Sequence, residues 1–179
     1  MDSEFHRRDE RRIVGLQIGR SPRSESSVVS ECHLGLPVVV RTPPILEDGT
    51  PFPTLYWLTC PLAVKRVSRI EAAGGVKAMD ARSGNDPDFA RRLDAAHRRY
   101  ASQRDSDVPP TVHPRPSGGV AGSRKGVKCL HAHYADHRAG NDNPVGEWSV
   151  PRIEPLDCTV PCVLLLSDGP ALNPDWRAS

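Results

Sequence analysis

Two short β-branched segments constrain the fold of this chain more than any other feature. They are SVVSEC at residues 27–32 and PVVVRT at residues 37–42, and the turn-prone HLGLP separates them. β-branched residues favour strands, and a gap that contains glycine and proline favours a chain reversal. The pattern therefore predicts two adjacent strands. A third strand is expected at TLYWLTC, residues 54–60, after a loop that contains Asp48-Gly49 and two prolines.

Three helices are expected to pack on these strands. Proline is favoured in the first turn of a helix, so Pro61 and Pro87 indicate helices over residues 61–73 and 86–104. The third helix is expected over residues 126–138, where apolar residues recur at helical spacing. Helices that follow strands in this order are typical of an α+β protein.

The sequence predicts a single α+β domain over residues 27–146, with a small antiparallel sheet of about three to four strands covered by three helices. Residues 1–26, rich in Arg, Ser and Glu, are expected to be mostly disordered, with a short helical turn within residues 13–18. Residues 105–124 contain many prolines and glycines, which favour a flexible loop. Residues 147–179 form a C-terminal extension, whose apolar VLLLSD predicts one more strand.

The charge balance argues against a nucleic-acid or membrane partner. Lysine and arginine number 24 against 22 aspartates and glutamates, which leaves a formal net charge of +2, and phosphate-rich partners select for a larger basic excess. The first residues, MDSEFHRRDERR, lack the apolar core of a secretory signal, and no apolar run approaches the ~18 residues of a membrane span. We therefore expect a cytoplasmic, and by its arginine-rich composition bacterial, protein. In that compartment the five cysteines are expected to be thiols or metal ligands.

The stretch KGVKCLHAHYADHRAG, which begins at Lys125, concentrates one cysteine and three histidines. On a helix, a rotation of about 100° per residue places Cys129, His133, Asp136 and His137 within one sector. Side chains at i and i+4 lie one above the other, so Cys129 with His133 can hold two corners of a tetrahedral zinc site. Two ligands do not complete a site, so others must come from elsewhere in the chain.

The remaining ligands have two candidate sources. Cys32 precedes the turn between the first two strands and Cys60 ends the third, and side chains at strand ends can converge. Alternatively, Cys158 and Cys162 form a Cys-x3-Cys pair, which is within the usual spacing of zinc ligands. The residues alone do not decide between these two sources.

Three other interpretations compete with the zinc site. The cysteine can be a small apolar residue in an ordinary helix that carries histidines on its surface. Cys129 can instead be the nucleophile of a hydrolase or transferase, with His131 or His133 as its base. A third alternative is a protein-interaction module in which PFPTLYWL, residues 51–58, offers an aromatic groove or an edge strand to a protein partner.

Several long segments carry a resemblance to a known family. ECHLGLPVVV, DGTPFPTLYWLTCP, EAAGG, GVKCLHAHYA and NDNPVG, in this order, resemble the bacterial domain of unknown function 501 over about Gly19 to Gly146. The resemblance supplies no activity. It implies that Cys32, Cys60 and the segment from Lys128 to His131 come together in the fold, although Glu31-Cys32-His33 departs from the Arg-Cys-Pro of the family.

The first hypothesis is therefore a zinc-binding protein. Its ligands would be Cys32, Cys60 and Cys129 together with either His131 or His133. A structural site would be closed by four protein ligands, whereas a catalytic site would keep one position for water. The sequence does not indicate a reaction, a substrate or an oligomeric state.

Overall fold

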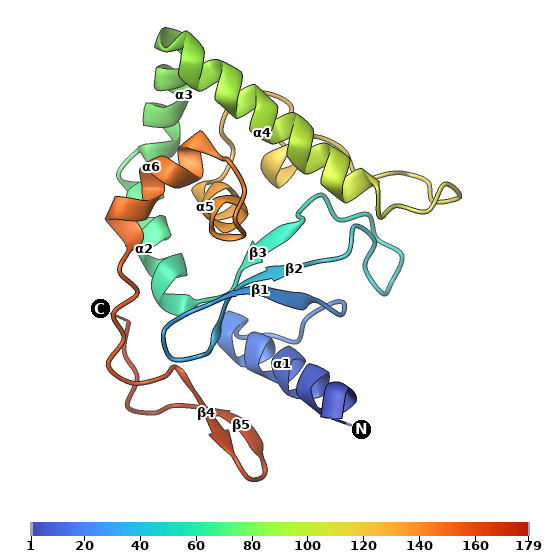
Figure 1. The fold of residues 1–179 in the computed structure, drawn as a ribbon, viewed down its shortest axis with the longest axis vertical. Coiled ribbons are helices and arrows are strands. Elements are labelled where there is room, and N and C mark those ends of the chain that lie inside the picture. Colours follow the sequence, from blue (N-terminus) through green and yellow to red (C-terminus); the bar gives the residue numbers. More distant parts are fainter. Residues whose placement is uncertain (1, 179) are drawn as a thin grey trace.

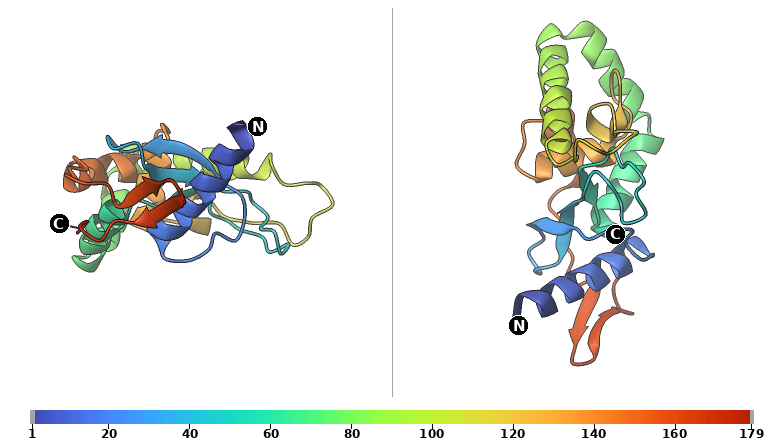
Figure 2. Two further views of the ribbon diagram at one scale, coloured as in Figure 1. Left: turned by 90° about the horizontal axis from the view of Figure 1, so that it is seen from below. Right: turned by 90° about the vertical axis from the view of Figure 1, so that its right-hand side faces the viewer.

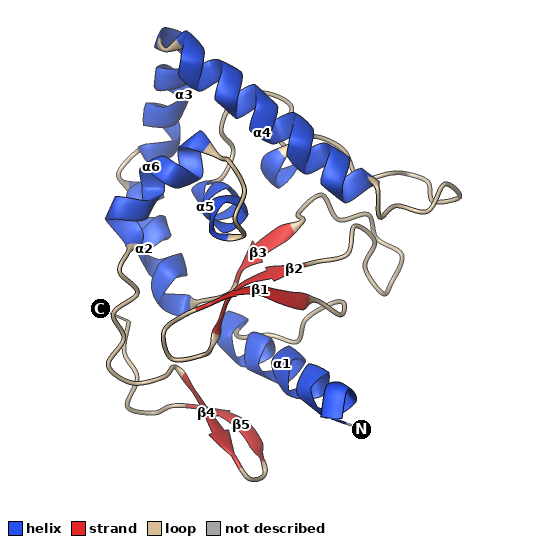
Figure 3. Ribbon diagram, in the orientation of Figure 1, coloured by secondary structure: helices blue, strands red, loops and turns tan. Residues whose placement is uncertain are grey.

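A computed structural model describes residues 2–178 of the chain, and the side chains of residues 9–178. Three strands, β1 (Ser27–Glu31), β2 (Pro37–Arg41) and β3 (Tyr56–Leu58), form one antiparallel sheet in the order β1-β2-β3 (Figures 1 and 3). Val40 of β2 pairs with Val28 on one side and with Trp57 on the other. The predicted strands are confirmed, and the α+β class with them.

Five helices gather on one side of this sheet, and a sixth, α1 (Asp2–Ile18), lies on the other, as Figure 1 shows for the described residues. Helix α5 packs directly against β3. The five helices are α2 (Pro61–Ala72), α3 (Gly75–Asn85), α4 (Pro87–Asp105), α5 (Leu130–Arg138) and α6 (Pro144–Ile153).

The two helices expected after Pro61 and Pro87 are confirmed as α2 and α4. The third begins later than expected, at Leu130 rather than at residue 126. Gly126 has a φ of +65°, and the N–H of Val127 donates to Asp80 Oδ1 at 2.7 Å instead of entering a helix. Cys129 is extended, with φ −154° and ψ 119°, and is the N-cap of α5.

The N-terminal segment, for which disorder is predicted, contains a helix. Residues 2–18 form a full helix, because Ile13 and Val14 of α1 are buried at 7% and 3% exposure. Gln17 Nε2 also donates to the carbonyl of Pro37 in β2 at 2.9 Å. The apolar positions of this helix thus have a partner that the sequence alone does not show.

The first part of the C-terminal segment packs into the core of the domain. Helix α6 crosses the expected boundary after residue 146, and its Val145 and Ile153 are fully buried. The expected strand at VLLLSD exists as β4 (Val163–Leu166), but it pairs with β5 (Gly169–Leu172) in a separate hairpin. Figure 2 shows this hairpin at the end of the molecule opposite α3 and α4.

Residues 105–124 are irregular, as expected, apart from one short 3-10 turn at Val120–Gly122. The segment is nevertheless tied to the core, because Val120 is fully buried and Arg104 donates to the carbonyl of Gly118 at 2.7 Å. Arg104 itself is only 1% exposed. The loop therefore covers α4 and is a packed part of the domain.

Candidate metal centre

The five predicted ligands do not meet at one point. Among the described residues, the one group of at least three His, Cys, Asp or Glu whose ligand atoms all lie within 4.8 Å of one another consists of Glu71, Cys129 and His131. This group keeps two of the predicted residues and adds a carboxylate. Cys32, Cys60 and His133 lie outside it.

Two helices position the group. Cys129 is the N-cap of α5, so the backbone N–H groups of His131 and Ala132 reach its thiol. His131 stands in the first turn of the same helix. Glu71 comes from the last turn of α2, and its Oε1 accepts a hydrogen bond from the N–H of Leu130 at 2.6 Å. That bond holds the carboxylate against the start of α5, beside the thiol and the imidazole.

The His131 ring connects the other two side chains through a single atom. Its Nδ1 lies 3.3 Å from Glu71 Oε1 and 3.8 Å from Cys129 Sγ. The three side chains are all half-buried, so neither bulk water nor a closed apolar core surrounds them. The carboxylate and the thiol therefore both lie next to Nδ1 of the ring.

The second nitrogen of His131 shows which atom carries the ring proton. Nε2 lies 3.2 Å from Ser68 Oγ and 3.3 Å from the carbonyl of Val64. Ser68 Oγ already donates to that carbonyl at 2.8 Å, so both oxygens act as acceptors toward the ring. We therefore assign Nε2 as a donor; in the tautomer with its proton on Nε2, Nδ1 carries a lone pair.

Glu71 Oε1 and, in this tautomer, His131 Nδ1 are acceptors, and the thiol of Cys129 is the one side-chain donor between them. A bound cation could take the place of the thiol proton. Burial raises the pKa of the Cys129 thiol above its ordinary value, and the neighbouring Glu71 carboxylate raises it further. The thiol stays protonated at neutral pH in this setting, whereas a bound cation would favour the thiolate.

A cavity of about 520 Å³ opens in front of Cys129 and His131. Its wall also includes Trp57 of β3, whose ring stacks on Phe52 with 5.5 Å between ring centroids. Tyr56, the neighbour of Trp57, is buried at 7% exposure on the opposite face of the strand. Both residues contribute to the lining, and Trp57 is the more exposed of the two.

Cys32 and Cys60 belong to another part of the molecule, where the C-terminal segment packs on the sheet. Cys60 is the N-cap of α2 and is 6% exposed, and burial raises the pKa of its thiol to about 11. Cys158 and Cys162 lie near enough to interact with it electrostatically. Cys162 accepts from Gln17 Nε2 at 3.7 Å, and Cys32 packs in the same small apolar cluster. All five cysteines are free thiols.

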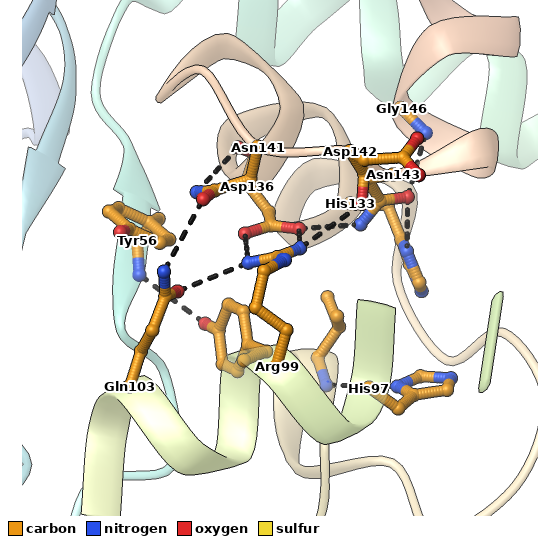
Figure 4. Close-up of polar contacts among 12 residues, drawn as sticks. Tyr56, His97, Arg99, Gln103, His133, Asp136, Asn141, Asp142, Asn143 and Gly146 are labelled. Carbon is orange, nitrogen blue, oxygen red and sulfur yellow. Dashed lines mark hydrogen bonds and ion pairs between the residues drawn. The ribbon is translucent and has the colours of Figure 1, made fainter. Parts of the chain in front are cut away.

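His133 points to the opposite side of α5 from His131, because two residues along a helix rotate by about 200°. Its ring is fully buried, and Nδ1 donates to Asn143 Oδ1 at 3.0 Å (Figure 4). Asn143 Nδ2 donates to Asp136 Oδ2 at 2.8 Å, and Arg99 binds both oxygens of Asp136 at 3.0 and 2.6 Å. Burial lowers the pKa of His133 to about 3, so the ring is neutral. These side chains join α4, α5 and α6.

The sequence prediction missed Glu71, which lies 59 residues before Leu130 in the chain. A signal was present, because Glu71 begins EAAGG, one of the segments that carry the family resemblance. A lone glutamate near the end of an amphipathic helix is typical of a solvated surface, so its spacing alone gives no indication of a ligand.

The comparisons with known proteins show the family of the chain. The model of the family described as "Protein of unknown function (DUF501)" matches residues 28–151. The chain belongs to this family. No curated protein and no solved structure matches the chain. All three residues of the candidate centre lie inside the matched range.

None of the helices in the described part of the chain is both long and apolar enough to cross a lipid bilayer.

Proposed function

We propose that this protein binds one zinc ion through Glu71, Cys129 Sγ and His131 Nδ1. The observation that carries the proposal is the convergence of three possible ligand atoms within 4.8 Å, one of them a histidine nitrogen whose ring is held by protein oxygens at its other nitrogen. Histidine ligands of metals are usually oriented in this way by a hydrogen bond from the second ring nitrogen.

The donor set favours zinc over other common cations. A thiolate together with an imidazole suits a borderline-soft ion, whereas magnesium and calcium prefer oxygen ligands. Ligand atoms bound to one tetrahedral zinc are about 3.5–4 Å apart, so a small closure of the three side chains is sufficient. Three protein ligands leave one coordination position, and the cavity beside Cys129 and His131 gives that position access to a small molecule.

The geometry supports a metal centre more strongly than a cysteine nucleophile. In a nucleophile–base–carboxylate arrangement, the nucleophile and the carboxylate use different nitrogens of the histidine ring. Here Glu71 and Cys129 both face Nδ1, while Nε2 is directed to Ser68 and Val64. A raised thiol pKa also works against a free thiolate nucleophile. A reduced, cytoplasmic environment is part of the proposal, since all five cysteines are free.

Metal analysis of the full chain, purified without a histidine tag, tests the proposal. We expect close to one zinc per chain in the wild type and a large loss in Cys129→Ser, Glu71→Gln and His131→Gln. Cys60→Ala is the matched control, because it removes a buried thiol outside the group. Cobalt substitution should give a thiolate charge-transfer absorption that Cys129→Ser lacks.

Two results would contradict this assignment. Wild-type protein with no zinc after purification and after reconstitution would remove the metal. If zinc is lost in Cys60→Ala and Cys32→Ser but retained in Cys129→Ser, then the metal site would have to be assigned to the other cysteines. Circular dichroism of each variant separates loss of the ion from loss of the fold.

A further inference from the structure

The wall of the cavity in front of the candidate centre has an unusual composition. Apolar side chains from four elements form most of it, with Ile18 from α1, Trp57 from β3, Val64 from α2 and Ala132 from α5 among them. Neither aspartate nor glutamate belongs to the lining. A volume of about 520 Å³ is within the range of pockets that enclose small organic molecules.

Two cationic side chains, Arg20 and Lys65, complete the lining. The guanidinium of Arg20 lies over the ring of Trp57, 5.6 Å from its centroid. Lys65 is half-buried, and its Nζ donates to the backbone carbonyl of Ala178 at 2.6 Å. Among the side chains that the structure describes, residues 9–178, no carboxylate forms an ion pair with either residue. Both cations of the lining thus lack an acidic partner among these described side chains.

Several other arginines of the described residues, among them Arg11, Arg23, Arg41 and Arg92, form close ion pairs with aspartate or glutamate. Arg20 is exposed and Lys65 is half-buried beside an apolar wall, so an anion that covers this wall would gain charge-assisted hydrogen bonds from them. The local charge and the apolar surface thus select together for an amphipathic anion.

We propose that the cavity binds a small carboxylate with a flat apolar body, such as an aryl- or alkyl-substituted short-chain acid. Its carboxylate would pair with Arg20 or Lys65, and its apolar body would lie against Trp57. The remaining end of the molecule would then approach Cys129 and His131. The role of that end as a reacting group rests on the proposed zinc site, but binding of the anion does not require the metal.

A carboxylate fits these groups better than a phosphate. Protein sites for phosphate generally combine backbone N–H groups at a helix N-terminus or several cations. Here each cation comes from a different segment, and Pro61 at the start of α2 has no N–H to offer. The first N–H groups of α5 are directed to Glu71 and to the thiol of Cys129. The wall supplies isolated charges in apolar surroundings, which suits a singly charged head group.

Fluorescence titration of the full-length protein tests the inference, because Trp57 lines the cavity. The probes are 3-phenylpropionate, its uncharged amide 3-phenylpropanamide, and phenyl phosphate. We expect 3-phenylpropionate to change the emission, with an affinity at least about tenfold higher than that of the amide, because a charge-assisted hydrogen bond contributes that much. Trp57→Phe should abolish the signal while Trp148→Phe retains it, since Trp148 does not line this cavity.

The variants Arg20→Gln and Lys65→Gln, singly and together, provide the decisive comparison. Both residues are at the surface of the cavity, so the variants should fold. We expect the double variant to weaken 3-phenylpropionate at least about tenfold and to leave the amide unchanged. Equal affinity of acid and amide, unchanged binding in the double variant, or preference for phenyl phosphate would each overturn the proposal.

Repeating the titration with Glu71→Gln separates this inference from the zinc site. Glu71 does not line the cavity, so we expect the anion to bind this variant even if it holds no metal. Zinc binding without any anion binding would overturn the inference alone. Anion binding without zinc would overturn the proposed function alone.

Discussion

Two polar clusters lie on opposite sides of helix α5, and they differ in how their polar atoms are paired. On one side, Asp136, Arg99 and Asn143 pair their donors with acceptors, and only Nε2 of His133 has no partner among the described residues. On the other side, Glu71, Cys129 and His131 bring together three atoms that can each bind a metal, and the Cys129 thiol is the one side-chain donor among them. The first arrangement is held by ion pairs and amide hydrogen bonds, whereas the second has a thiol proton that a cation could replace.

The contrast shows how to tell structural polar groups from a binding site. Asn143 accepts from the N–H groups of Val145 and Gly146, at 3.2 and 3.1 Å, and so also caps α6. Every part of that cluster has a role in joining helices. Glu71, by comparison, receives one backbone N–H and otherwise faces the sulfur and the ring nitrogen. Convergence of a carboxylate, a thiol and an imidazole on one point is the arrangement that a metal ion would use.

The largest expected effect is the removal of the buried carboxylate. Asp136→Ala leaves Arg99 and Asn143 without their shared acceptor in a site where Asp136 is fully buried. Breaking a buried ion pair costs about 3–5 kcal/mol of unfolding free energy. Urea denaturation measures it, with Asp107→Ala as a control that breaks the exposed pair with Arg41 and should cost less than about 1 kcal/mol. Equal losses would mean that the two pairs are equivalent.

The next effect belongs to the opposite cluster. Zinc at 100 times its dissociation constant should add about 2.7 kcal/mol to the unfolding free energy, provided that the unfolded chain does not bind it. Urea midpoints in buffered zinc and in chelator measure this difference. Glu71→Gln should remove it, whereas Asp107→Ala should retain it in full. A midpoint that is the same with zinc and with chelator in the wild type would contradict the assignment.

Acid should weaken the buried cluster through His133. Its folded pKa of about 3 lies below the ordinary histidine value of 6.5, mainly because burial disfavours the charged ring. Between these two values the unfolded state binds a proton that the folded state does not, so stability falls as the pH falls, by up to about 1.4 kcal/mol per pH unit. His133→Asn keeps a donor for Asn143 and cannot titrate.

We therefore expect His133→Asn to reduce the slope of unfolding free energy against pH in that window. The slope is the useful quantity, because the smaller side chain also leaves a cavity that lowers stability at every pH. His113→Asn, in the exposed part of residues 105–124, is the matched control and should leave the slope unchanged. If both variants behave alike, then His133 is not the source of the acid sensitivity.

The smallest effect concerns the support of His131. Ser68→Ala removes one of two acceptors of Nε2, and the carbonyl of Val64 at 3.3 Å remains. Loss of a whole supporting group typically weakens metal affinity about 10–100-fold, so a loss below about tenfold is expected here. Competition with a chromophoric chelator measures it. An unchanged affinity would show that the Val64 carbonyl orients the ring alone.

Local signals predicted the elements that depend on local chemistry. The β-branched runs gave the strands of the sheet, and Asp86 caps α4 with its carboxylate accepting from the N–H of Phe89 at 3.0 Å. The same logic would have found α6, since Asn143-Pro144 repeats the pattern of Asp86-Pro87. Helix α3 was not predicted, because a Gly-Gly pair such as Gly74-Gly75 normally ends a helix. Gly74, at φ +89°, instead turns a corner from which α3 begins at once.

The candidate centre was predictable only in part, for a similar reason. Cys129 and His131 are two residues apart, so their proximity follows from the chain itself. Glu71 reaches them through the packing of α2 against α5, which no short-range pattern encodes. Cys60, a predicted ligand, lies outside the centre because it caps α2 at the opposite end of that helix from Glu71. The length of α2 therefore keeps Cys60 apart from Glu71.

Part of the cavity wall lies outside the residues that the family model matches, whereas the candidate centre lies inside them. Gln17, Ile18 and Arg20 line the cavity, yet they precede residue 28, where the family match begins. Replacing residues before 28 with the leading segment of another family member would therefore change part of the cavity lining and leave Glu71, Cys129 and His131 in place. The side chains to which we assign ligand selection and metal binding would then be inherited in part on separate stretches of the polypeptide.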